Sequence, residues 1–142
     1  MVNWIYIVVI GKKMKDNMVS NQIKIKGVSS FLENKSDINN SIFIFIYKIK
    51  IKNESDSQIK LLSRHWDIKD ANGKIDIVDG EGVVGENPIL NPGDMYEYNS
   101  FCPLKTNFGS MKGHYTFIKE NNGEIFKSTI PEFSLITPNN IN

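Results

Sequence analysis

Apolar and polar residues alternate along most of the chain, and this pattern predicts β-strands. The strongest alternation covers residues 41–52, where large apolar side chains occupy every second position. Because successive side chains of a strand point to opposite faces, this series predicts a face that packs into the core. Its members are Phe43, Phe45, Tyr47, Ile49 and Ile51. No stretch of helical length shows the 3.6-residue period, so we expect an all-β protein.

The opposite face of the same strand changes character along its length. It begins with Ile42, Ile44 and Ile46 and continues with lysine at every second position. An apolar surface of this kind tends to be buried against another part of the structure. The N-terminal segment, another strand or a second subunit could bury it. The three isoleucines are therefore our candidate interface, either for a homodimer or for another protein.

Further alternating segments are separated by turn residues and predict a β-sandwich. A hairpin turn is expected at Asn72-Gly73, a dipeptide that favours tight turns. About eight short strands with regularly spaced turns are typical of a single-domain sandwich of the fibronectin type III or immunoglobulin kind. The other predicted strands cover residues 23–28, 59–70, 75–77, 95–101, 111–119 and 124–136.

Two local patterns refine this expectation. In the strand that ends before the hairpin turn, alternation places Leu62, Arg64 and Trp66 on one face, with Trp66 buried. Residues 90–96 have the spacing of a tyrosine corner, in which a tyrosine hydroxyl bonds to nearby backbone. We therefore expect the hydroxyl of Tyr96 to bond to the main chain close by.

Length, charge and cysteine content exclude several classes of protein. A chain of 142 residues is the size of one domain, and a net charge of +1 gives no overall attraction for nucleic acid. Cys102 is the only cysteine, which excludes an internal disulfide and suits a reducing cytoplasm. We expect Cys102 to be a small core residue rather than a nucleophile.

The N-terminal segment differs from the rest. Trp4–Ile10 is apolar but far shorter than the ~20 residues that a membrane helix needs, so no membrane insertion is expected. The alternating pattern begins near Gln22. We interpret residues 1–17 as a loose tail or a mis-assigned start, with an extra edge strand as the alternative. The domain then comprises residues 18–142.

The segment 80–85 fits the glycine pattern G-x-G-x-x-G, which seats a pyrophosphate at a helix N-terminus. Gly80, Gly82 and Gly85, with Arg64, are accordingly the candidate site for a pyrophosphate-containing nucleotide. However, prolines and acidic residues follow the glycines, and neither favours a helix that binds phosphate. The alternative is a tight structural loop whose glycines adopt positive φ.

Acidic residues concentrate around this loop. Residues 67–97 contain eight carboxylates and two lysines, a local charge of −6. Asp76, Asp79 and Glu81 could supply oxygen ligands to Mg²⁺ or Ca²⁺ or, more weakly, to a transition metal such as Co²⁺, although they lack the order of an EF-hand loop. The alternative is a solvated acidic surface, and we expect no tightly bound cofactor.

Candidate catalytic residues are few. His65 stands beside Arg64 and could act as a base or ligand, while His114 is the only other histidine. No nucleophile motif or complete catalytic set can be assembled from the sequence. We therefore expect a binding protein and not an enzyme.

Taken together and in order, several segments resemble the ApaG family, and the resemblance covers about residues 20–138. They are Leu61–Trp66, Asp70–Gly73, Gly80–Glu86, Pro88, Pro92-Gly93, Tyr96–Tyr98, Gly109–Tyr115 and Ile130–Leu135.

The resemblance implies a fibronectin-like or immunoglobulin-like sandwich whose sequence starts near Met18. It also implies a small cytoplasmic protein with a genetic link to cobalt resistance and magnesium efflux. Related eukaryotic domains look like protein-interaction modules, which suggests a protein partner. The glycine loop has been suggested as a pyrophosphate site in this family.

Overall fold

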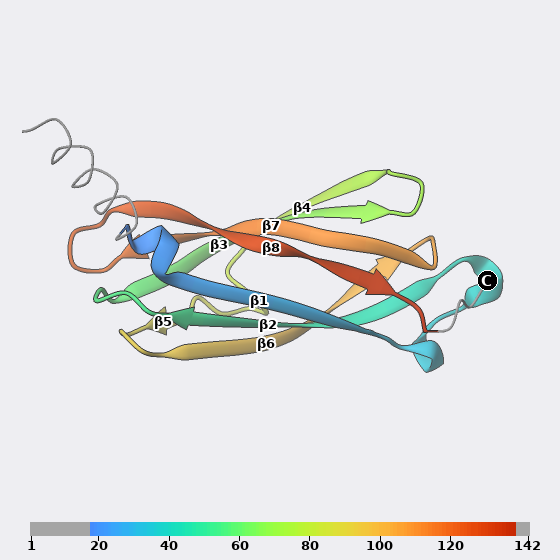
Figure 1. Cartoon of the computed structure of the whole chain (residues 1–142), viewed down its shortest axis with the longest axis horizontal. Helices are drawn as coiled ribbons and strands as arrows, with labels where there is room; N and C mark the ends of the chain where they lie inside the picture. Colours follow the sequence, from blue (N-terminus) through green and yellow to red (C-terminus); the bar gives the residue numbers. More distant parts are fainter. Residues whose placement is uncertain (1–17, 139–142) are drawn as a thin grey trace, which may run out of the picture.

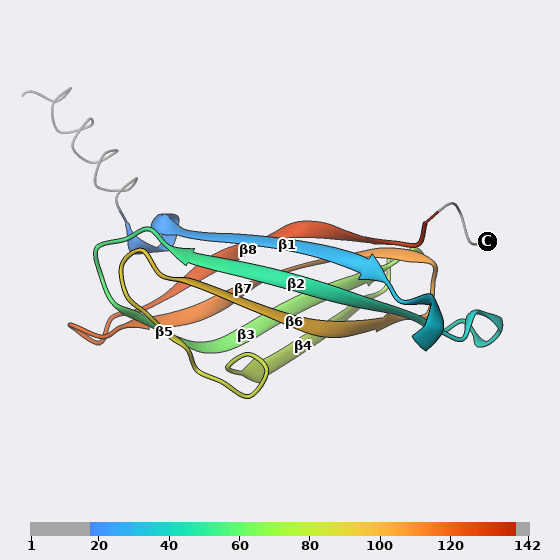
Figure 2. The same cartoon turned by 90° about the horizontal axis from the view of Figure 1, so that it is seen from below.

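The computed structural model describes residues 18–138, in which eight strands form two antiparallel sheets (Figures 1 and 2). This confirms the predicted all-β sandwich. The first sheet has the order β1–β2–β6; the second has the order β4–β3–β7–β8, with β5 paired to β3. The predicted tail at residues 1–17 lies outside the described residues. The strands are β1 (Ile23–Phe31), β2 (Phe43–Asn53), β3 (Ile59–Asp70), β4 (Ile75–Glu81), β5 (Ile89–Leu90), β6 (Met95–Leu104), β7 (Phe108–Lys119) and β8 (Ile125–Ile136).

Strand β2 supplies the centre of the core, as its pattern predicts. Phe45, Ile49 and Ile51 are completely buried, and Tyr47 is nearly so. Trp66 on β3 lies opposite them, with its ring edge-on to Tyr47 at a centroid distance of 5.5 Å. Full burial of each large apolar side chain contributes about 1.5–3 kcal/mol, so this layer holds the sheets together.

Strand β3 contains a bulge that changes which of its residues face the core. The pairing with β7 shifts between Leu61 and Ser63, so two consecutive residues occupy the space of one. Leu61 is completely buried, whereas Leu62 is only partly buried. The prediction that Leu62 shares the core face with Trp66 was therefore wrong, because the bulge resets the alternation before Ser63.

Residues 90–96 have the spacing of a tyrosine corner, but the tyrosine hydroxyl bonds to a side chain and not to the backbone. The hydroxyl of Tyr96 donates to the carboxylate of Glu86 at 2.9 Å, so the prediction of a backbone acceptor was wrong. Partial burial and the nearby carboxylate raise the pKa of Tyr96 to about 12. The contact ties the loop after β4 to strand β6.

The two sides of the sandwich are built differently. On one side β1 lies beside β8: Gly27 leaves room for the ring of Phe133, and the hydroxyl of Ser29 donates to the carbonyl of Ser134 at 2.6 Å. On the other side β4 has no strand opposite it in the β1–β2–β6 sheet. Figure 1 shows the β3–β4 hairpin extending away from that sheet.

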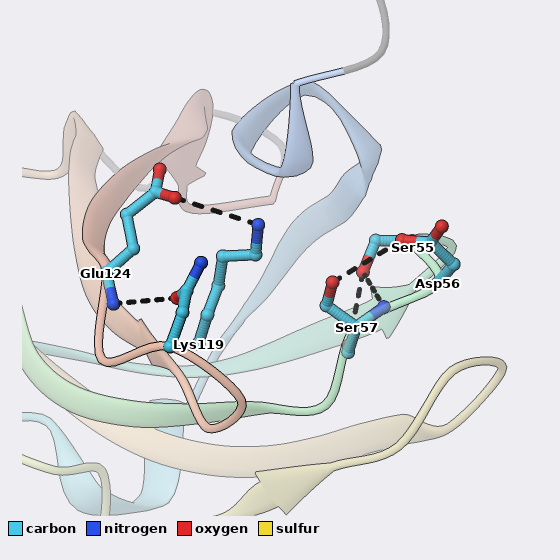
Figure 3. Close-up of polar contacts among 6 residues, drawn as sticks. Ser55, Asp56, Ser57, Lys119 and Glu124 are labelled. Atoms are coloured by element: carbon cyan, nitrogen blue, oxygen red, sulfur yellow. Dashed lines mark hydrogen bonds and ion pairs between the residues drawn. The ribbon is translucent and has the colours of Figure 1, made fainter.

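Short polar contacts close the ends of the strands. Figure 3 shows Lys119 and Glu124, whose side chains form an ion pair at 3.7 Å across the β7–β8 turn. In the β2–β3 turn, Asn53 donates to the carbonyl of Ser57 and accepts from Ser55. Three short 3₁₀ helices complete the described chain: η1 (Val19–Gln22), η2 (Glu33–Lys35) and η3 (Ile38–Asn40).

The bulge in β3 predicts different outcomes for two neighbouring substitutions. Leu61→Ala should lower the free energy of unfolding by about 2–5 kcal/mol, because it leaves a cavity in the core. Leu62→Ala should lower it by less, by about 1 kcal/mol, since Leu62 is only partly buried and solvent can fill part of the space that it leaves. Urea unfolding followed by circular dichroism measures both; equal losses would contradict the register described here.

Candidate functional site

The glycine loop is a tight β-turn that leads from β4 toward β5. Val83 and Glu86 exchange both backbone hydrogen bonds, and Val84 and Gly85 between them have φ of 43° and 80°. The backbone N–H of Gly82 donates to the carbonyl of Leu62. Three of the loop's N–H groups therefore already have partners, and no helix begins there. A pyrophosphate cradle needs these groups free and a helix N-terminus behind them.

Arg64 lies against this loop, so the structure brings the predicted residues together. Nη1 of Arg64 donates to the carbonyl oxygens of Glu81 and Gly82, both at 2.9 Å. Gly80 gives the guanidinium its space, because a Cβ at that position would approach Cζ to 2.5 Å. The guanidinium thus satisfies carbonyl oxygens, which a lysine could not do with the same planar geometry.

Three buried tyrosines, Tyr47, Tyr98 and Tyr115, interact electrostatically with the partly buried Arg64. The hydroxyls of Tyr98 on β6 and Tyr115 on β7 hydrogen-bond to each other across the two sheets. Burial raises the pKa of Tyr47, Tyr98 and Tyr115, and the charge of Arg64 partly opposes this. These hydroxyls stay protonated and serve as neutral hydrogen-bonding groups at neutral pH.

The three candidate metal ligands do not converge. In β4, Asp79 and Glu81 lie on one face and Asp76 on the other, because residues alternate along a strand. Among residues 18–138, no group of three or more histidine, cysteine or acidic side chains could hold a metal ion. The predicted strand ended at residue 77, so the opposite placement of Asp76 and Asp79 follows only once β4 is seen to continue to Glu81.

Two histidines meet on the outer face of the second sheet, a juxtaposition that the sequence did not reveal. His65 pairs with His114 across β3 and β7, and their rings stack at a centroid distance of 4.7 Å. Nδ1 of His65 lies 2.6 Å from Asp79, and Nε2 lies 3.1 Å from Asp67. His65 is therefore held between two carboxylates and against a second ring.

The two histidines differ in pKa for that reason. The hydrogen bond to Asp79, supported by Asp67, raises the pKa of His65 above its ordinary value. Burial, followed by the charge on His65, lowers the pKa of His114. His65 therefore holds its proton to higher pH than His114 does, and Asp79 and Asp67 are the groups that stabilise its charged form.

The candidate interface lies on the outer face of the β1–β2–β6 sheet. Ile44 and Ile46 point outward from β2, while Ile42 precedes the strand and is 43% exposed. Register with the neighbouring strands adds Phe101, which is 56% exposed, together with Pro103 from β6 and Val28 from β1. Hydropathy along the chain could not indicate these additions, because they depend on strand pairing. We call this surface the apolar face: Val28, Ile44, Ile46, Phe101 and Pro103.

Lysines continue the outer face beyond the apolar residues. Two acidic residues accompany them. A carboxylate oxygen of Glu97 lies 3.6 Å from Nζ of Lys48 and 3.8 Å from Nζ of Lys50, and one of Glu54 lies 3.9 Å from Nζ of Lys52. One end of this sheet is thus apolar and the other basic. The lysine stripe consists of Lys24, Lys26, Lys48, Lys50 and Lys52.

Cys102 belongs to the core. Its side chain is 2% exposed, and burial raises the pKa of the thiol to about 12. A thiol of this kind is almost entirely protonated at neutral pH and is a poor nucleophile. Within residues 18–138, no helix has the length and apolar composition needed to cross a membrane.

Comparison with known proteins identifies the family. The family model described as "ApaG domain" matches residues 33–119. Protein ApaG of Agrobacterium fabrum is 52% identical over 108 residues, covering 76% of this chain and 82% of the relative. The chain belongs to the ApaG family. Protein ApaG of Beijerinckia indica is 42% identical over 120 residues, covering 84% of this chain and 92% of the relative.

A solved structure supports the same assignment. The crystal structure of the ApaA protein from Bordetella pertussis superposes with a TM-score of 0.79 at 36% identity, covering 82% of this chain and 94% of that one. The matched ApaG domain includes Arg64, the glycine loop and most of the apolar face. The features described above therefore lie largely within the segment that defines the family.

Substitution of Gly82 should reveal a structural role. Gly82 has φ of 62°, and a Cβ there would approach the carbonyl oxygen of Glu86 to 2.3 Å. Gly82→Ala should therefore lower the free energy of unfolding by about 1–3 kcal/mol. Thermal-shift assays with ATP and diadenosine tetraphosphate should show no stabilisation of the wild type. Nucleotide stabilisation that Gly82→Ala abolishes would instead assign the loop to a ligand.

The histidine pair predicts a pH dependence with a definite sign. Because the pKa of His65 is raised in the folded state, its stabilisation is complete below its unfolded pKa and disappears as pH rises through the folded pKa. Asp79→Asn should therefore destabilise the protein more at about pH 5.5 than at about pH 8.5. NMR titration should show that this variant lowers the pKa of His65; an unchanged pKa would remove Asp79 as its cause.

Proposed function

We propose that this ApaG-family protein acts by binding a protein partner through the apolar face, and not by catalysis. The observation that supports this is the pairing of exposed Phe101 with Ile46, and of Pro103 with Ile44, between β6 and β2. On the other side of β2, exposed Val28 of β1 lies diagonal to Ile46, opposite Lys48. Scattered surface apolar residues are ordinary, but a contiguous patch with a charged border is typical of a protein interface.

The border of the apolar face indicates the chemistry of the partner. The lysine stripe follows it along the same outer surface, with Glu97 as a partial counterion. A partner with an apolar anchor flanked by acidic side chains would match both parts. Aromatic anchors such as Phe101 typically supply most of the binding energy at such interfaces, while the charges guide orientation.

A role in divalent-cation homeostasis, which the family resemblance implies, is proposed to be indirect. Asp76 lies on the face of β4 opposite Asp79 and Glu81, so these acids offer no shared Mg²⁺ or Co²⁺ site. The chain would therefore act in the cytoplasm through a partner that itself handles the ion. A pyrophosphate ligand has less support, since N–H groups of Gly82 and Val83 are already bonded within the fold.

Two matched phenylalanines test this proposal. Phe101 and Phe108 are 56% and 50% exposed, but Phe108 lies on β7, outside the apolar face. Phe101→Glu should abolish capture of the specific partner from a lysate, while Phe108→Glu should leave capture unchanged. Quantitative mass spectrometry of proteins bound to each immobilised variant measures the difference, followed by calorimetry with the purified partner.

Two results would contradict the proposal. Equal capture by the wild type and Phe101→Glu would show that the apolar face does not bind the partner. A concentration-dependent dimer in sedimentation experiments that Phe101→Glu converts to monomer would show that a second copy occupies the face instead. Circular dichroism confirms in each case that the variant is folded.

A further inference from the structure

Strand β4 is an open edge whose free backbone groups can be assigned. The N–H of Asp70 donates to the carbonyl of Lys74, and the N–H of Gly82 donates to the carbonyl of Leu62. With the β3–β4 register, these bonds direct the backbone groups of even-numbered residues of β4 toward β3. Those of Ile75, Ile77 and Asp79 therefore point away from the sheet, toward a position that no strand of residues 18–138 occupies.

The other edges are better protected than β4. Strand β1 lies beside β8, and β8 contains Pro131 and a bulge opposite Met111 and Gly113. On β6, Pro103 lacks an N–H group that an added strand could use. Strand β4 has no proline, lysine or bulge to oppose strand addition, and its only such devices are its carboxylates.

The side chains of β4 also favour an added strand. Ile75 and Ile77 are 52% and 63% exposed on its outer face, and Val78 is 40% exposed on its inner face. A hollow of about 300 Å³ opens beside Asp76 on the inner side and is lined in part by Ile42, Ile68 and Leu104. An added strand would cover the outer isoleucines and direct alternate side chains toward the hollow.

Charge indicates what kind of strand would bind. Strand β4 carries Asp76, Asp79 and Glu81 and no lysine or arginine. A second copy of β4 would bring these acids toward their equivalents, whereas lysine or arginine on a partner would neutralise them.

We propose that β4 recruits an extended, basic segment of a partner protein as an added antiparallel strand. On the outer face, basic side chains would lie beside Asp79 and Glu81, and apolar side chains would lie beside Ile75 and Ile77. This site is separate from the apolar face, which lies on the other sheet and borders lysines. The inference therefore goes beyond the proposed function and does not depend on it.

A synthetic peptide tests the added strand directly. The probe is a capped peptide of the length of β4 with threonine at every second position. The positions between the threonines are lysine in the N-terminal half and valine in the C-terminal half. Running antiparallel to β4, it sets its lysines beside Asp79 and Glu81 and its valines beside Ile75 and Ile77. The control peptide replaces each lysine with glutamate.

Amide hydrogen exchange measured by NMR distinguishes strand addition from looser binding. The lysine peptide should slow exchange at the outward-pointing amides of Ile75, Ile77 and Asp79 by at least about tenfold. The amides of Asp76 and Val78, already bonded to β3, should change little. The glutamate peptide should have no effect.

Matched variants separate this site from the rest of the surface. Ile77→Lys adds a charge to the edge and should abolish peptide binding, while Ile125→Lys, at a residue of nearly equal exposure on β8, should not. Phe101→Glu should bind the peptide as the wild type does, so failure of the proposed apolar interface leaves this test intact.

Three outcomes would overturn the inference. One is unchanged exchange at the β4 amides at saturating concentrations of the lysine peptide. Another is equal protection by the lysine and glutamate peptides, which would remove the charge argument. The third is protection of Ile75, Ile77 and Asp79 without peptide that grows with protein concentration, which would assign the edge to a second copy.

Discussion

The alternation of side chains along β2 is the constraint on which the rest of the structure depends. One face of this strand, from Phe43 to Ile51, forms the centre of the core, and the other face carries isoleucine and then lysine. The same register that aligns Phe45 with Cys102 inside the sandwich aligns Ile46 with Phe101 outside it. A shift of β2 by one residue would exchange the two faces, so folding and the proposed interface depend on one register.

Arg64 anchors the glycine loop on the side of the sandwich where β4 has no opposing strand. Its guanidinium fixes the carbonyls of Glu81 and Gly82, and Tyr96 then ties Glu86 to β6. The loop therefore closes part of this side, whereas the β3–β4 hairpin beyond it remains without an opposing strand. The well-ordered glycine loop and the exposed edge of β4 are thus neighbours in the chain.

Sequence patterns predicted the positions of the strands better than they predicted how the strands pair. The strand at 41–52 and the buried Trp66 were evident from hydrophobic periodicity, which is a local property. The bulge near Leu61 was not, because an inserted residue leaves no distinct hydropathy signal. Likewise, the stacking of His65 on His114 and the position of Phe101 beside Ile46 depend on pairing between strands distant in sequence.

The hydroxyl pair of Tyr98 and Tyr115 constrains which substitutions this sandwich can accept during evolution. Each hydroxyl is buried and has the other as its partner, across the gap between the two sheets. Loss of one hydroxyl alone leaves the other buried without a hydrogen-bond partner, whereas loss of both leaves a well-packed apolar contact. The two positions are therefore expected to covary in descent, with both tyrosine or both phenylalanine favoured over the mixed pairs.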